Sequence, residues 1–166
     1  MGSLHAFADF GDDAKGESLD DSFKDCMQVI SLSHGVTQGR SATRGDAGGG
    51  VSIAEFGNYV IRKYADKATP KLLELASNGK HVPKVTISIC KPIGGKQTKY
   101  LVHELKNVLV TGYHTDADSG GSDNYPIETI TLDYDHVAVT YTQVAQDGTS
   151  KGNTAFKWDR AKSASA

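Results

Sequence analysis

Hydrophobic positions recur along this chain with either the period of a helix or the period of a β-strand. A convincing helical period occurs in one place. Between residues 69 and 78, apolar side chains recur at the spacing that gathers them on one side of a helix, namely Leu72, Leu73, Leu75 and Ala76. Thr69 is suited to the N-cap, and Pro70 to the first turn, where a missing N–H costs nothing. Gly79 is suited to a left-handed position after the last turn. The pattern predicts one short helix with an apolar side that packs on a sheet.

Most of the remaining chain alternates apolar and polar side chains, which is the period of a half-buried β-strand. The alternation predicts strands at about residues 4–10, 26–36, 51–64, 85–90, 98–113, 127–134, 137–144 and 154–159. Glycine-rich and polar stretches separate them, as turns do in β-rich folds. The expected fold class is therefore all-β, a two-sheet β-barrel or sandwich with one short flanking α-helix at about residues 69–78.

The strand at residues 98–113 changes phase in its middle. Leu101, His103 and Leu105 hold one alternation, whereas Val108 and Val110 hold the other. A shift of one residue near Lys106-Asn107 indicates a bulge or a sharp bend. Such a bend lets one strand take part in two sheets.

Length and composition indicate a single globular domain covering residues 1–166. The chain has 166 residues, 38% hydrophobic and 23% charged, with a formal net charge of −2. This balance gives no electrostatic reason to expect a nucleic acid partner or an anionic membrane. Residues 37–50 are expected to form an extended loop and residues 161–166 a flexible tail.

Targeting and redox signals are weak. Residues 4–10 are too short, and too interrupted by His5 and Asp9, for a signal peptide. No stretch approaches the ~20 apolar residues of a membrane span, so no membrane insertion is expected. Cys26 and Cys90 both fall in predicted strands and are interpreted as buried free thiols, although two positions do not exclude a disulfide.

The usual catalytic and metal-binding motifs fail at required positions. Gly94-Gly95-Lys96 lacks the first glycine and the final hydroxyl of a phosphate loop. His103-Glu104 has Asn107 where a zinc protease motif needs histidine. Asp116, Asp118 and Asp123 lack further calcium ligands, and Arg44-Gly45-Asp46 is a chance tripeptide. We therefore expect neither an enzyme nor a bound cofactor or metal.

Small uncharged polar residues form pairs on several predicted strands. The pairs are Ser31 and Ser33, Thr86 and Ser88, Thr129 and Thr131, and Thr140 and Thr142. Ordinary solvent-facing strand positions explain them. A second interpretation is a smooth, wetted wall lining a channel, since exposed strand faces usually carry more lysine and glutamate.

Several segments together resemble the Hcp family, the tube protein of the bacterial type VI secretion system. They are residues 15–18 (KGES), 31–35 (SLSHG), 66–81 (DKATPKLLELASNGKH), 100–101 and 105–110 (YL and LKNVLV), 128–132 (ETITL) and 146–148 (QDG). No single segment is specific, but their order and spacing are, and they cover most of the chain from about residue 15 to 158.

The resemblance implies a homohexameric ring that stacks into a tube, which a contractile sheath drives out of the cell beneath a spike protein. It implies effector proteins as cargo in the ring lumen, with Ser31 and Ser33 on the lumen wall. The loop over residues 37–50 fits no fixed pattern of the family, and we hypothesise that Arg40, Ser41, Thr43, Arg44 and Asp46 form a ring-stacking loop. Such a protein is made in the bacterial cytoplasm and leaves without a cleaved signal peptide.

Two alternatives remain open at this point. A secreted, monomeric ligand- or carbohydrate-binding β-sandwich would need an aromatic platform, for which Tyr113, Tyr125 and Trp158 are the candidates. A hydrolase would need His34, His103 or His114 beside an aspartate. Measuring the mass in solution separates a ring from a monomer.

Overall fold

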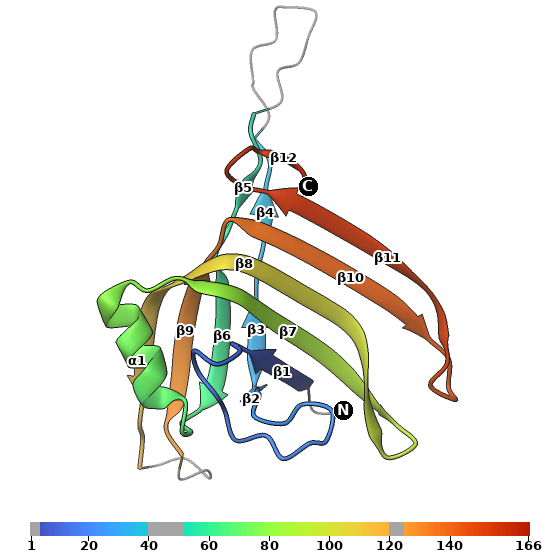
Figure 1. Ribbon diagram of the computed structural model, residues 1–166, viewed down its shortest axis with the longest axis horizontal. Coiled ribbons are helices and arrows are strands. Elements are labelled where there is room, and N and C mark those ends of the chain that lie inside the picture. The colour runs from blue at the N-terminus through green and yellow to red at the C-terminus, as the bar shows by residue number, and fades with distance from the viewer. Residues whose placement is uncertain (1–3, 40–51, 120–124) are drawn as a thin grey trace, which may run out of the picture.

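The computed structural model describes residues 4–39, 52–119 and 125–166, and places them in one helix and a series of antiparallel strands (Figure 1). The elements are β1 (His5–Asp9), β2 (Met27–Val29), β3 (Ser31–Ser33), β4 (Val36–Thr37), β5 (Glu55–Phe56), β6 (Tyr59–Tyr64), α1 (Thr69–Asn78), β7 (Val82–Ile93), β8 (Lys96–Asp116), β9 (Ile127–Asp133), β10 (His136–Val144), β11 (Ser150–Asp159) and β12 (Ala164–Ser165). The all-β class with one flanking helix is confirmed.

The strands form two layers joined at two corners. Sheet A has the order β12-β11-β10-β8-β7-β1-β2, and sheet B runs β3-β6-β9-β8. The long strand β8 belongs to both, and the segment β2–β3 passes from one sheet to the other. These two crossings close a barrel, and β10 and β11 continue sheet A beyond it (Figure 1).

The expected bend in β8 lies at Asn107. Residues up to Lys106 pair with β7 and β10, and residues from Leu109 onward pair with β9. Asn107 itself takes a left-handed backbone conformation, with φ of 52°. Its side chain donates a hydrogen bond to the Asp135 carboxylate. Asparagine tolerates this conformation better than most residues, which explains its place at the corner.

The prediction of one continuous strand over residues 26–36 is wrong. The structure divides this stretch into β2, β3 and β4, and the faces change at Ile30. Met27 and Val29 are buried before the change, whereas Leu32 packs against the core after it. The N–H of Ile30 donates to the Arg62 carbonyl at 2.7 Å, so the chain leaves β1 and joins β6.

Helix α1 has the predicted bounds, but a different N-cap. Gly79 ends the helix with φ of 66°, as expected. Ala68, not Thr69, occupies the N-cap, without a side-chain capping bond. Thr69 lies one position later, and its hydroxyl contacts sheet B instead. Leu72 and Leu75 are buried, whereas Leu73 is 44% exposed, so the packed side is narrower than predicted.

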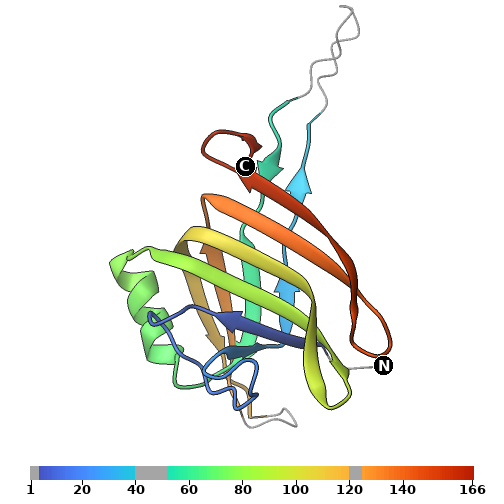
Figure 2. The same cartoon turned by 45° about the vertical axis from the view of Figure 1, so that its right-hand side comes forward.

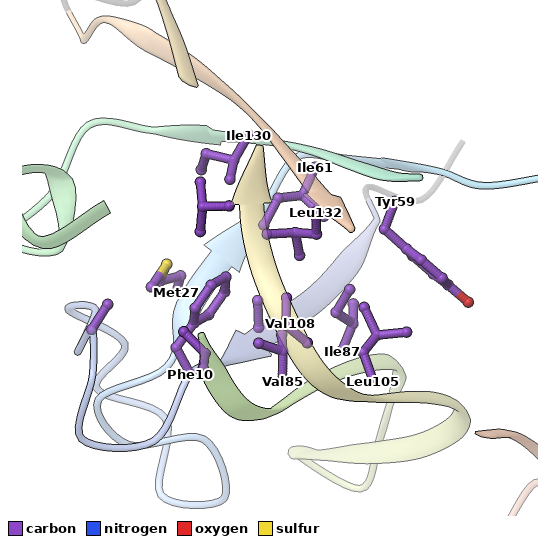
Figure 3. Packing of buried hydrophobic residues seen from close by; sticks show 14 of the residues in the cluster. Phe10, Met27, Tyr59, Ile61, Val85, Ile87, Leu105, Val108, Ile130 and Leu132 are labelled. Atoms are coloured by element: carbon purple, nitrogen blue, oxygen red, sulfur yellow. The ribbon is translucent and has the colours of Figure 1, made fainter. Parts of the chain in front are cut away.

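The core fills the space between the sheets and the helix. Figure 3 shows its central side chains: Phe10, Met27, Tyr59, Ile61, Val85, Ile87, Leu105, Val108, Ile130 and Leu132. These positions alternate along the strands, as the period-two pattern predicts. The short hairpin between β7 and β8 turns at Gly94 and Gly95, both with positive φ, which matches the twist of the flanking strands.

The two ends of the barrel differ. The paired strands β4 and β5 project as an arm from one end, and β6 and β9 reach the opposite end, beside α1 (Figures 1 and 2). In the tail, Ala164 and Ser165 pair with Trp158 and Asp159 of β11. The flexibility of residues 161–166 stays a prediction.

Candidate functional site

The outer face of sheet B carries two rows of mostly small side chains. In the first row, Ser31 pairs with Arg62, and Arg62 pairs with Thr129. In the second row, Ser33 pairs with Val60, and Val60 pairs with Thr131. Since the core-facing residues alternate with them, these side chains point away from the core. We call these six residues the polar wall.

The polar wall joins residues that are distant in the sequence. The structure thus places the predicted Ser31 and Ser33 on the same sheet face as Thr129 and Thr131, about a hundred residues later, with β6 between the two strands. Ser33 is exposed, and Ser31, Thr129 and Thr131 are half-buried. Apart from Arg62, the wall is uncharged, so it presents short hydroxyl groups on a stiff sheet.

The other two polar pairs do not belong to this wall. Thr86, Ser88, Thr140 and Thr142 lie in sheet A. Ser88 is only 3% exposed, and Ser22, Phe23 and Cys26 of the preceding loop line the same hollow. The four pairs therefore do not form one continuous wall. The alternation along each strand shows which residues share a face of that strand, but not which of the two sheets the strand joins. The proposed stacking residues Arg40, Ser41, Thr43, Arg44 and Asp46 lie outside the described residues.

An aromatic surface that sequence reasoning missed lies on sheet A, where β10 and β11 extend past the barrel. Tyr141 is 48% exposed and Phe156 is 45% exposed. The Phe156 ring lies 6.4 Å from the Trp158 ring, and both stack near Phe56 of β5. Tyr141 meets Tyr100 edge to face at 6.3 Å. We call Tyr141 and Phe156, with Val139 between them, the aromatic patch.

The aromatic patch borders an open strand edge. On the outer side of β11, β12 pairs only with Trp158 and Asp159. Within the described residues, Ser150 to Lys157 are all exposed. Open edges and exposed aromatic rings are features of surfaces that pair with other chains. The sequence does contain a signal for this face, namely the alternating pairs Val139 and Tyr141 in β10 and Phe156 and Trp158 in β11. To interpret it, one would need to know that these strands extend past the end of the closed barrel.

The candidate aromatic residues of a carbohydrate platform lie in separate places. Trp158 belongs to the group at β11, Tyr125 meets Tyr64 at the far end of sheet B, and Tyr113 donates to the Glu128 carboxylate at 2.6 Å. No shared flat surface connects these three rings in the described part of the chain. The structure therefore gives the monomeric carbohydrate-binding alternative no support.

A buried ion pair fastens the helix to sheet B. Lys63 Nζ donates to Glu128 Oε2 at 2.6 Å and to Asp66 Oδ1 at 2.9 Å, and the Lys63 and Glu128 side chains are fully buried. Thr69 Oγ1 and Tyr113 OH also donate to Glu128. Burial pushes the pKa of Glu128 upward, but these donors outweigh it, and the pKa is lowered overall. The carboxylate thus stays charged and holds the start of α1.

Two of the histidines proposed for a hydrolase contact tyrosines rather than aspartates. His103 Nδ1 lies 2.8 Å from the Tyr59 hydroxyl, and His34 Nε2 lies 2.9 Å from the Tyr134 hydroxyl. Burial lowers the pKa of His103 to about 4 and also lowers that of His34. Both are therefore neutral at physiological pH and act as packing groups. His114 contacts Asp116 at 3.0 Å on an exposed strand end.

The two cysteines are buried and unpaired, in a small cluster with Phe7 and Phe23. Burial raises the pKa of each thiol to about 11, so neither is a reactive thiolate. Over residues 4–39, 52–119 and 125–166, no group of three metal-ligating side chains comes together. The same residues contain no helix long and apolar enough to cross a membrane.

Solved structures share this architecture. A type six secretion system protein superposes with a TM-score of 0.90 at 25% identity, covering 99% of this chain and all of that one. Hcp1 from Salmonella typhimurium superposes with a TM-score of 0.75 at 23% identity, covering 97% of both chains. A type VI secretion system effector from Yersinia pestis gives 0.71 at 23%, covering 93% and 98%. The fold of this chain is thus the β-barrel fold of these type VI secretion proteins.

Sequence comparison identifies the family. The family described as "Type VI secretion system effector, Hcp" matches residues 7–141. Protein hcp1 of Pseudomonas aeruginosa is 41% identical over 90 residues, which is 54% of this chain and 54% of that protein. The match thus spans about half the length of that relative. The chain belongs to the Hcp family of type VI secretion proteins, and the predicted resemblance is confirmed.

Proposed function

We propose that this chain forms homohexameric rings, which stack into the inner tube of a type VI secretion system and carry effector proteins in their lumen. The spike protein and the contractile sheath are the other partners in this proposal. The role is structural rather than enzymatic, and needs no cofactor. The protein is made in the bacterial cytoplasm and exported by the machine itself, without a cleaved signal peptide.

The observation that carries the ring proposal is the aromatic patch beside the open edge of β11. A monomer would leave these rings in water, whereas a neighbouring subunit would cover them. A head-to-tail contact repeated by rotation closes into a ring, and leaves both ring faces free to stack. Family membership supports the same arrangement.

The test is the mass in solution by size-exclusion chromatography with light scattering. The expected particle is six times the 17.7-kDa chain and persists on dilution. Phe156→Glu should convert it to smaller species, because a charge cannot be buried there without a partner. Lys157→Glu is the matched control, since its side chain points to the opposite face of β11. If the Phe156→Glu variant still formed hexamers, the aromatic patch would not be part of the subunit interface.

The polar wall, with Ser31 and Ser33, is proposed to face the lumen. Short hydroxyl side chains form a surface that can contact a folded cargo protein without selecting for one particular amino-acid sequence. Ser33→Gln should reduce retention of a co-expressed effector protein, because its longer side chain projects from the wall. Thr140→Gln, the same kind of change on the outer face of sheet A, is the control. Equal retention by the two variants would remove the lumen assignment.

The residues Arg40, Ser41, Thr43, Arg44 and Asp46 are proposed to contact the next ring. This placement is supported by the position of the chain segments that flank these residues. The strands β4 and β5 lead outward from one end of the barrel (Figure 2). Ring stacking that survived deletion of residues 44–48 would contradict this placement.

A further inference from the structure

A groove made of two adjoining hollows lies at the end of sheet B where β6 ends, beside the start of α1 (Figure 1). The first hollow encloses about 290 Å³ and the second about 310 Å³, and both are lined by Gln28 and Tyr64. Glu17 and Tyr125 line the first hollow, and Leu4 and Ile30 line the second. We call the two hollows together the barrel-end groove.

The barrel-end groove continues the face that carries the polar wall. Along β6, Val60 and Arg62 belong to the wall, and Tyr64 is the next residue on the same side of the strand. Tyr64 pairs with Ile127 of β9, as Arg62 pairs with Thr129. Arg62 itself lines neither hollow. A protein that lies against the polar wall can therefore reach the groove without leaving that face.

The first hollow offers aromatic rings. Tyr125 is 69% exposed and Tyr64 is 39% exposed. Their rings meet edge to face, with centroids 6.4 Å apart. Because the face of an aromatic ring attracts cations, this pair is suited to a guanidinium or an ammonium group.

The same hollow carries two carboxylates, Glu17 and Asp66, and no lysine or arginine among its described lining residues. Lys63 offsets the charge of Asp66 through a contact at 2.9 Å. Glu17 Oε1 accepts from the neutral backbone N–H of Lys67 at 2.9 Å, and the Lys67 ammonium contacts Asp25 instead. Glu17 is thus held in place while it keeps its charge, and a cation in this hollow would meet it first.

The second hollow has an apolar lining. Leu4 is 44% exposed, Ile30 is half-buried, and the buried Val29 also lines the hollow. Exposed apolar side chains beside a hollow are typical of surfaces that another molecule covers. Because the two hollows adjoin, neighbouring residues of one peptide, a basic one and an apolar one, can occupy both.

We propose that the barrel-end groove binds an arginine or lysine of the cargo protein, together with an adjacent apolar residue. Charge complementarity with Glu17 and the two tyrosine rings favour the cation. Continuity with the polar wall favours the cargo as its source. This inference rests on the proposed function, because it requires that the wall faces a lumen. It adds a selective contact to a wall that is itself unselective.

Peptide binding to the purified assembly tests the cation site. The probe is the capped peptide acetyl-Arg-Leu-amide. Its control is acetyl-citrulline-Leu-amide, which has nearly the same shape without the charge. Saturation-transfer NMR should show that the arginine and leucine side chains contact the protein. Titration should give a dissociation constant about fivefold lower for the arginine peptide, which corresponds to roughly 1 kcal/mol.

Three variants locate the binding. Glu17→Gln keeps an oxygen that can accept from the Lys67 N–H, so it removes only the charge. It should weaken binding of the arginine peptide about fivefold and leave the citrulline peptide unaltered. Tyr125→Leu should also weaken the arginine peptide, since it removes an exposed ring without opening the core. Asp12→Asn, the matched change at an exposed carboxylate of the same loop, should have no effect.

Retention of a co-expressed effector protein tests the cargo assignment. Glu17→Gln should lower the amount of effector retained, whereas Asp12→Asn should not change it. Unchanged retention in Glu17→Gln would overturn the cargo assignment. Weaker contact between rings in that same variant would then identify a second copy of this chain as the occupant.

Light scattering on the same samples separates this inference from the proposed function. Hexamers that bind the arginine and citrulline peptides equally would overturn the inference and leave the ring intact. A monomeric mass would overturn the ring proposal, and the cargo assignment with it, whatever the peptides do.

Discussion

The buried Lys63–Glu128 pair makes a sharp prediction about stability. Lys63→Met should lower the free energy of unfolding by about 3–5 kcal/mol, the usual cost of leaving one buried charge without its partner. That cost applies because both side chains are fully buried and their charged atoms lie 2.6 Å apart. Globular domains are stable by only about 5–15 kcal/mol, so the loss is large.

Removing both charges should cost less than the two single changes together. Glu128→Leu alone leaves Lys63 buried with Asp66 and the Tyr64 carbonyl as its acceptors. In Lys63→Met/Glu128→Leu, the remaining Tyr113 hydroxyl is half-buried and can reach water. With about 3–5 kcal/mol expected for each single change, and no more than about 4 kcal/mol for the double variant, the coupling energy should be about 2 kcal/mol or more.

The assay is urea unfolding at one fixed protein concentration, with the mass of each variant checked first, since assembly changes apparent stability. Lys71→Met/Glu74→Leu removes an exposed pair of similar length on α1 and should not move the midpoint measurably. The reasoning is refuted if Lys63→Met resembles that control, or if the two single losses simply add.

Three further predictions concern single residues. Because the folded state lowers the pKa of His103 to about 4, the unfolded chain binds a proton at higher pH than the folded one. The free energy of unfolding should therefore fall by roughly 2 kcal/mol between pH 6.5 and 4, and His103→Gln should remove that part of the slope in urea unfolding. Asn107→Ala should lose about 1–2 kcal/mol by calorimetry, since alanine tolerates φ of 52° less well; an unchanged melting temperature would contradict this. Gly16→Ala would place a Cβ 2.4 Å from the Cys26 carbonyl oxygen and should lose at least about 2 kcal/mol, whereas Gly35→Ala, with open space around its Cβ, should fold normally.

The helix and the barrel class were predictable because their signals are local. Pro70, the spaced leucines and Gly79 define a helix within one stretch of chain, and the structure has it at residues 69–78. The change of phase near Asn107 likewise marked the corner of β8. In both cases the residues that carry the signal are neighbours in the sequence.

The second corner was missed although the sequence marks it. Met27 and Val29 are apolar in one phase and Leu32 in the other, so the alternation slips by one residue at Val29-Ile30, where the chain changes sheets. The slip does not name the new partner, since the N–H of Ile30 donates to the carbonyl of Arg62 in β6, some thirty residues away. Thr69 shows the same limit, since its hydroxyl contacts Glu128 across the fold rather than capping its own helix.

The sequence by itself determined the period of each segment, the helix, the turns and, through ordered family segments, the Hcp family. Tertiary structure decided which sheet each strand joined, and thus which of the four small polar pairs share a face. It also decided that Lys63 meets Glu128, and that Tyr141 and Phe156 lie beyond the barrel. The physical reason is that periodicity reports which side of a strand faces the core, whereas surfaces are assembled from strands that pair across long separations in the chain.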